Sequence, residues 1–301
     1  MKKMLLTGIA MMTLANVTAP LYSSTPVTYT TVQAAEAINF DKGNQSEEEY
    51  VKSIIDQLLK QDALEVELKT GEEEPDLMII DLANKALKQT QNLAMFEENK
   101  TYEGYFYDDG KYTEPIEMAL TNIELTNMDN PDAKKLVEEI KKEVEGKFII
   151  KEDEAVKGNV STIIDTYKKL ASEFENYEEK DGKIIASTKE SSLKDAPNAD
   201  MLMQFYGEKA TMFKELTIDP KAQTIQLLHK INVPEEAETT EEDPAAGIKL
   251  SPPTEITYNF KASSEKLPKL EELETLTMDD LNKLVEEKGL KTEADAASSE
   301  S

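Results

Sequence analysis

Apolar residues recur three or four positions apart in several stretches of the chain, which is the pattern of an amphipathic helix. The first stretch predicts a helix over about 46–62, and Ser46 with Glu49 forms the capping-box pattern that begins a helix. A second strong stretch predicts a helix over 160–175. The remaining expected helices lie at 136–146, 201–206 and 277–289.

Other stretches alternate apolar and polar residues, which is typical of strands with one buried face. The expected strands are 64–68, 102–107, 148–150, 184–188, 212–218, 225–233 and 256–261. We expect a further strand over 116–125, with a bulge where its alternation slips. Residues 76–98 fit either a helix or a strand. Hairpin turns are expected at 108–111 and 180–183. Helices mixed with hairpin-joined strands predict an α+β fold with one dominant, mostly antiparallel sheet.

Part of this pattern resembles a known family. It consists of a helix followed by 181–187, the element 216–221 leading into a long strand, the strand 256–260 followed by 267–268, and the strand and turn 105–112. Over roughly 46–265, the chain resembles secreted Gram-positive lipoproteins that are similar to the bacterial lipoprotein-carrier (LolA-like) fold. The resemblance implies a curved, half-barrel-like sheet covered by helices on one face. It also implies an apolar ligand, such as an acyl chain or lipid-like group, on the concave face.

The apolar phase of the expected strands supplies candidate ligand contacts, with helices 46–62 and 160–175 as their cover. The candidate ligand-binding residues are Met118, Ile225, Leu227, His229, Ile231, Tyr258 and Phe260. His229 is the only histidine of the chain and follows the apolar phase of its strand. It is either a polar group inside the cavity or a core histidine, and the second interpretation is favoured because no partner for it is evident in the sequence.

The first 35 residues have the layout of a secretory signal peptide, with a basic start, an apolar middle and a small-residue end. Cleavage is expected after Ala34 or Ala37, and an uncleaved membrane anchor is the alternative. Five segments are then expected along the chain. They are the signal peptide 1–35, a flexible lead-in 36–45, an α+β domain 46–290 that could divide into halves near 146–158, an acidic excursion 234–253 inside it, and a disordered tail 291–301.

Composition narrows the choice of function. The 301 residues carry 34 basic and 61 acidic side chains, a formal net charge of −27, which disfavours nucleic acid as a partner. Cysteine is absent, so the chain lacks the lipid-anchoring cysteine usual in the family it resembles. We therefore expect a secreted, extracellular protein that is released or associated with the cell wall, and not a transmembrane protein after signal cleavage.

No motif for catalysis, metal binding or a cofactor stands out. The sequence holds no nucleophile elbow, phosphate-binding loop or EF-hand pattern. We expect a non-enzymatic carrier-like protein without cofactor or metal that buries an apolar ligand on its sheet. The alternatives are an envelope-associated interaction or structural protein, and a secreted hydrolase that uses paired carboxylates. A hollow sheet face would favour the carrier, and a filled face would favour the interaction protein.

Overall fold

The computed structural model describes residues 36–71, 75–92, 101–196, 199–234 and 254–292. The expected signal peptide, nearly all of the acidic excursion and most of the expected tail lie outside the described residues. The chain forms two compact units. The first contains the described residues up to 85 and from 158 to 266, and the second contains 86–157 and the described residues from 267 onward. Both units combine helices with mostly antiparallel strands, so the predicted α+β class is confirmed.

The first unit is built on an open antiparallel sheet with the strand order β2-β1-β12-β11-β10-β8-β7. A short strand, β9, pairs separately with β10. The strands of this unit are β1 (Ala63–Thr70), β2 (Asp76–Asp81), β7 (Asn176–Lys180), β8 (Lys183–Ser187), β9 (Ser191–Ser192), β10 (Thr211–Asp219), β11 (Thr224–Asn232) and β12 (Glu255–Ser263). Its helical elements are α2 (Glu47–Leu59), α5 (Asn159–Glu173), η2 (Leu193–Asp195) and α6 (Ala199–Tyr206).

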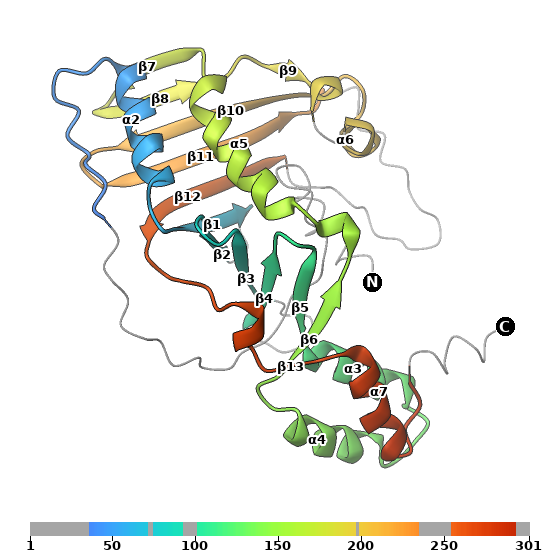
Figure 1. The fold of residues 1–301 in the computed structure, drawn as a ribbon. Coiled ribbons are helices and arrows are strands. Elements are labelled where there is room, and N and C mark those ends of the chain that lie inside the picture. Colours follow the sequence, from blue (N-terminus) through green and yellow to red (C-terminus); the bar gives the residue numbers. More distant parts are fainter. Residues whose placement is uncertain (1–35, 72–74, 93–100, 197–198, 235–253, 293–301) are drawn as a thin grey trace. The chain divides into compact units, whose positions relative to one another are not determined.

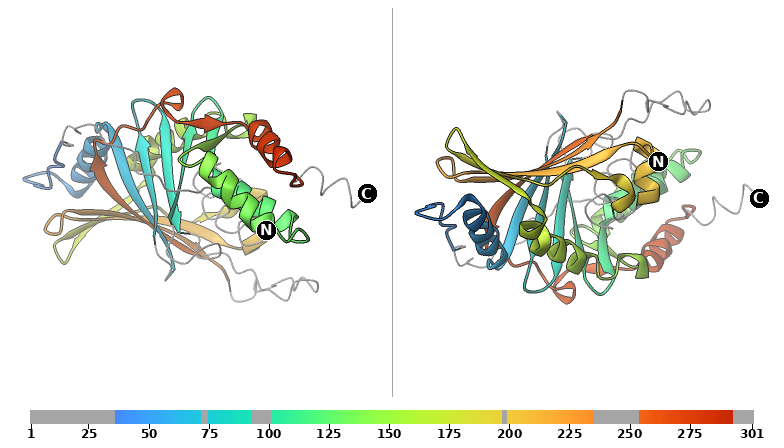
Figure 2. Two further views of the ribbon diagram at one scale, coloured as in Figure 1. Left: turned by 90° about the horizontal axis from the view of Figure 1, so that it is seen from below. Right: turned by 90° about the horizontal axis from the view of Figure 1, so that it is seen from above.

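The helices α2 and α5 pack on one face of this sheet, as predicted (Figures 1 and 2). Alternation along each strand explains why that face is covered and the other is not. On β11, Ile225 and Leu227 are buried while Gln226 between them is exposed. On the uncovered face, the side chain of Gln226 donates a hydrogen bond to Asn259 on β12, with a distance of 3.0 Å. An antiparallel sheet with one apolar and one polar face is the expected result of such alternation.

The second unit joins a smaller sheet to a helical cluster. Its sheet has the order β13-β6-β5-β4-β3, and only the short β13 runs parallel to its neighbour. The strands are β3 (Ala86–Asn92), β4 (Thr101–Tyr107), β5 (Lys111–Pro115), β6 (Phe148–Glu152) and β13 (Thr275–Leu276). The helical elements are α3 (Ile116–Thr126), α4 (Ala133–Glu143), η1 (Glu154–Val156), η4 (Leu270–Glu272) and α7 (Met278–Glu287). Aliphatic side chains from α3, α4 and α7 form a common core.

The expected strand over 116–125 is wrong, because these residues form helix α3. Ile116, Ala119, Leu120 and Ile123 are buried, and their spacing of three, four and seven positions is that of one helix face. The apparent slip in the alternation was therefore the helical period. In the ambiguous segment 76–98, the described residues form the strands β2 and β3, and residues 93–100 lie outside the described part.

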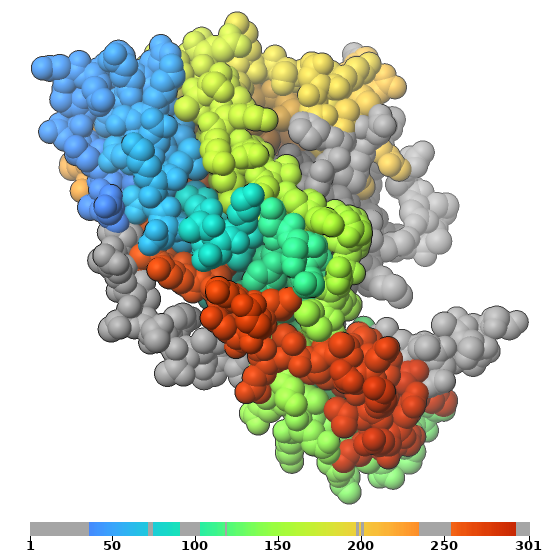
Figure 3. All heavy atoms as spheres, in the orientation of Figure 1, coloured from blue at the N-terminus to red at the C-terminus, as the bar shows by residue number. Residues whose placement is uncertain are grey.

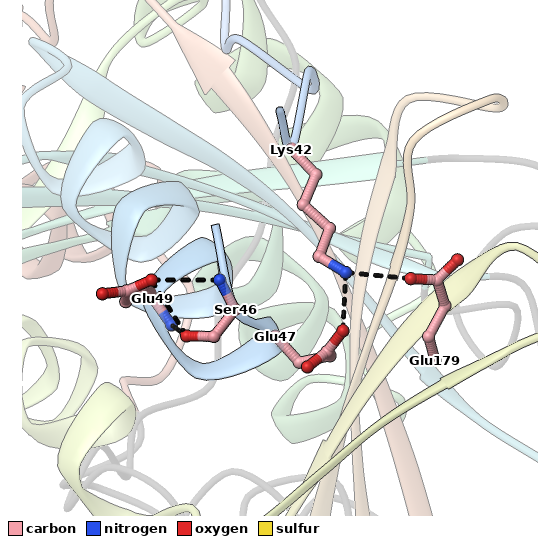
Figure 4. A network of polar contacts seen from close by, with 5 residues as sticks. All are labelled: Lys42, Ser46, Glu47, Glu49 and Glu179. Carbon is pink, nitrogen blue, oxygen red and sulfur yellow. Dashed lines mark hydrogen bonds and ion pairs between the residues drawn. The ribbon is translucent and has the colours of Figure 1, made fainter. Parts of the chain in front are cut away.

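The lead-in to α2 lies against the first unit (Figure 4). Lys42 Nζ contacts Glu47 at the start of α2 at 2.6 Å and Glu179 on β7 at 2.9 Å. These contacts raise the pKa of Lys42. The hydroxyl of Tyr50 donates to the carbonyl oxygen of Phe40 at 3.0 Å. The predicted capping box of α2 is also confirmed, since both of its reciprocal hydrogen bonds are present.

Candidate binding site

The candidate ligand contacts on β11 and β12 lie on the helix-covered face of the first unit. Ile225 stands opposite Phe260, Leu227 opposite Tyr258 and His229 opposite Ile256. All of them are buried, as is Ile231. The sequence pattern therefore placed six of the seven candidates on one face of two paired strands. Because all six are buried, with Ile231 packed against residues of η2 and α6, none of them forms an open surface.

Met118 does not belong to this group. It lies in α3 of the second unit, and its side chain lies outside the described part of the structure. It was assigned to the sheet because the segment around it was interpreted as a strand. The correction follows from the helical spacing of its buried neighbours.

Side chains of α2 and α5 fill the space above the sheet. Tyr167 of α5 packs edge-on against Phe260 of β12, with ring centroids 5.2 Å apart. A small cavity among the described residues is lined by Ile55, Leu58, Leu59, Leu64, Tyr167, Leu170, Leu216, Ile225 and Phe260. Its volume is about 20 Å³. A single water needs at least about 10–15 Å³ on this scale, so this cavity has no room for an acyl chain.

His229 is buried on this face with one of its nitrogens unpaired. The residue is 6% exposed, and Nε2 has no hydrogen-bond partner among the described residues. Burial, and to a smaller extent the nearby positive charge of Lys214, together lower the pKa of His229 from 6.5 to about 3. The imidazole is therefore neutral at physiological pH. A core histidine agrees with this placement, but the expected hydrogen bond at Nε2 is missing.

Tyr258 carries a second unpaired polar atom on the same face. Its Oη is buried without a partner among the described residues, and burial raises the pKa of the phenol well above its ordinary value. Tyr258 stands opposite Leu227, two positions from His229 on the neighbouring strand, so the two residues are diagonal neighbours. Each unpaired buried polar atom costs roughly 1–3 kcal/mol. Such atoms are few in native proteins, so each of them needs a physical explanation.

A charged pair connects this face to α5. Lys214 on β10 stands directly opposite His229 on β11. Its ammonium forms an ion pair and hydrogen bond with the carboxylate of Glu173, the last residue of α5. The Lys214 side chain is only 13% exposed, so this pair is less screened by solvent than the surface ion pairs.

A larger hollow lies on the outer side of the two helices, whose surfaces adjoin in Figure 3 (blue and yellow-green). We call it the outer groove. It is lined by Glu48, Lys52 and Asp56 of α2, by Lys168, Ala171 and Ser172 of α5, and by Phe174 and Tyr177. Its volume is about 400 Å³, which falls within the range of roughly 300–1,000 Å³ typical of ligand pockets.

Charges in the outer groove are only partly paired. Lys52 contacts Glu48 at 2.5 Å, and Lys168 contacts Asp165 at 3.0 Å. Asp56 has no hydrogen-bond or ion-pair partner among the residues that the structure describes. Lys52 and Lys168 each have a carboxylate partner, so Asp56 is the one carboxylate of this lining without a partner among the described residues.

The outer groove is not among the sites predicted from the sequence. A signal for its α2 wall exists, because Glu48, Lys52 and Asp56 recur every four residues and so share one face of the predicted helix. That pattern is equally typical of any solvated helix surface. Only the packing of α2 beside α5 turns it into one side of a hollow.

Neither metal binding nor membrane insertion finds support in the described residues. They contain no group of three or more His, Cys, Asp or Glu side chains arranged to hold a metal ion. None of their helices combines the length and the apolar character needed to cross a bilayer. No protein-family model, curated protein or solved structure matches this chain.

Proposed function

We propose that this protein is a non-enzymatic binding protein that holds a cationic segment of a partner protein in the outer groove. The proposal rests on the different volumes of the hollows on the two sides of α2 and α5. Among the described residues, an apolar cavity of about 20 Å³ lies on the side facing the sheet, whereas a hollow of about 400 Å³ lies on the solvent side. A filled sheet face is what the interaction function requires.

Charge supports a cationic occupant. The chain has a net charge of −27, which attracts positively charged partners over long range and speeds their encounter. Inside the groove, Asp56 is the acceptor that remains available to a Lys or Arg side chain. The rings of Phe174 and Tyr177 offer apolar contact to a neighbouring residue of the same segment.

The proposed location is outside the cell, either released or associated with the cell wall. It rests on the signal-like residues 1–35 and the absence of cysteine for a lipid anchor. A partner segment rich in Lys would meet the protein in the envelope. The resemblance to secreted lipoproteins of the lipoprotein-carrier fold agrees with this location.

The test uses a short synthetic peptide that alternates Lys with Leu, titrated into the protein and followed by NMR. We expect chemical-shift changes at residues of α2 and α5 that line the groove. Asp56→Asn should weaken binding about threefold, since exposed ion pairs contribute roughly 0.2–1 kcal/mol. Ser172→Tyr, which fills the groove without changing the charge, should weaken binding more than tenfold.

Asp195→Asn is the matched control, because Asp195 is exposed, lies outside the groove lining and removes the same charge. Equal losses in Asp56→Asn and Asp195→Asn would mean that the peptide responds to net charge alone, and the proposal would fail. A peptide with Glu in place of Lys should not bind.

An apolar-ligand carrier is the second candidate, favoured by the wholly apolar lining of the inner cavity. It requires α2 and α5 to move away from the sheet, because the cavity as it stands holds about one water. Native mass spectrometry with palmitate tests it. Leu59→Trp, which fills the cavity, should abolish a palmitate adduct that Leu125→Trp on α3 leaves intact. Absence of any adduct in the unmodified protein would exclude this candidate.

A further inference from the structure

The C-terminal turn of α5 has different roles on its two sides. Its outer side contributes Ala171 and Ser172 to the outer groove. Its inner side carries Glu173, whose carboxylate is held by Lys214 of β10. A change that separates Glu173 from Lys214 would therefore also shift Ala171 and Ser172, which line the groove.

His229 stands beside Lys214, the residue of the sheet that holds Glu173. Cross-strand neighbours directly opposite each other on an antiparallel pair have Cβ atoms about 4.5–5.5 Å apart. Lys214 and His229 are such a pair, and both side chains lie on the helix-covered face. A proton on His229 would place a second positive charge beside the Lys214 ammonium, in a site largely shielded from water.

We propose that Glu173, Lys214 and His229 form an acid-sensitive latch that holds the end of α5 on the sheet and thereby keeps the outer groove in shape. This inference rests on the proposed function of the groove, since it describes how that site is regulated. With the latch closed, His229 is neutral and Lys214 is paired with Glu173. When the turn lifts, His229 reaches solvent and takes up a proton, which stabilises the lifted state.

The other ionisable groups near His229 do not titrate in the acid range. Tyr258 on β12 and Tyr167 on α5 are buried, and burial raises the pKa of both phenols. Tyr206 on α6, which packs with Ile231, has its pKa raised to about 12 for the same reason. We therefore expect acid to act on this face through His229.

The size of the effect follows from proton linkage. A histidine that titrates at 6.5 when exposed and at about 3 when buried favours the lifted state about tenfold per pH unit within that interval. Between pH 7 and pH 5, the ratio of lifted to closed states should rise roughly 25-fold.

Amide hydrogen exchange on the free protein tests the latch without any ligand. After correction for intrinsic rates, protection of the amides 170–173 should fall roughly 25-fold from pH 7 to pH 5. Amides of α4 in the second unit serve as the internal control and should keep their protection.

His229→Gln, which cannot take a proton at this pH, should remove the change at α5. His229→Leu serves if the first variant does not fold. Lys214→Met should lower the protection of α5 already at pH 7.

Unchanged protection at α5, an equal fall at α4, or the same fall in the His229 variants would each overturn the latch.

Binding of the Lys-Leu peptide then tests the link to the groove. Affinity should drop between pH 7 and pH 5 in the unmodified protein and stay level in His229→Gln. A lifted α5 without a change in affinity would refute the regulation. A peptide that binds at neither pH would refute the groove function and leave the exchange result to decide the latch.

Discussion

Asn127 in the second unit and His229 in the first are buried polar side chains with opposite hydrogen bonding, although the second unit also holds an unpaired buried atom, Glu117 Oε2. In the second unit, Asn127 is 2% exposed, and its amide nitrogen donates to the carbonyl oxygens of Ile123 and Lys291 at 2.8 and 2.9 Å. Its oxygen accepts from the Lys291 N–H at 2.8 Å. In the first unit, His229 Nε2 and Tyr258 Oη are buried without partners among the described residues. A satisfied polar group fixes a structure, whereas an unsatisfied one leaves strain that a proton or a movement can release.

The largest expected effect is therefore at Asn127. Asn127→Ala removes three side-chain hydrogen bonds, two of which connect α3 to the backbone N–H and carbonyl oxygen of Lys291. We expect a loss of about 2–3 kcal/mol in the free energy of unfolding of the second unit. Urea denaturation followed by NMR signals of α3 and α7 measures it. Asn122→Ala, at an exposed position of the same helix, should change the stability by less than about 0.5 kcal/mol. Similar effects of the two variants would contradict the structural role of Asn127.

The second-largest expected effect is a greater loss of stability in acid for the first unit than for the second. The pKa of His229 is lower in the folded state than in the unfolded state, so its contribution is fully present above pH 6.5 and is lost as the pH falls toward 3. The first unit should lose about 2 kcal/mol at pH 5 relative to neutral pH, since each pKa unit corresponds to about 1.4 kcal/mol.

Urea midpoints measured at several pH values from NMR signals of β11 give the pH dependence of the first unit's stability. His229→Gln should remove most of this pH dependence. The second unit, which lacks histidine, provides the comparison. A slope that survives in His229→Gln would assign the acid sensitivity to carboxylates instead.

The sequence predicted helix caps and strand alternation better than it predicted buried polar groups without partners. The capping box at Ser46 was visible because the cap and its partner Glu49 are three residues apart. The alternation in β11 and β12 was visible because burial follows a period of two. The unpaired state of His229 could not be predicted, since partners across a sheet lie far apart in sequence. Helix α3 was misread because its apolar residues fit both periods over a short span.

Two buried tyrosines provide a third comparison, within the first unit. Tyr50 and Tyr258 are 1% and 2% exposed, but only Tyr50 has a hydrogen bond, to the carbonyl oxygen of Phe40. Tyr258→Phe should raise the free energy of unfolding by about 1 kcal/mol, because it removes an unsatisfied hydroxyl. Tyr50→Phe should lower it by a similar amount, because it removes a hydrogen bond. Thermal denaturation of both variants measures the difference, and equal signs would show that Tyr258 finds a partner in solution.

The smallest effect is expected where polar groups meet in water, on the uncovered face of the same sheet. Lys261 contacts Glu65 at 3.0 Å and Glu67 at 2.6 Å, with its side chain 55% exposed. Water and salt screen these pairs, so Lys261→Met should lower the stability by less than about 1 kcal/mol and by nothing measurable at high salt. Lys69→Met, which removes an exposed lysine from β1, is the matched control. A larger loss that persists in salt would mean that this face is less hydrated than its alternation implies, and the contrast between covered and uncovered polar groups would need revision.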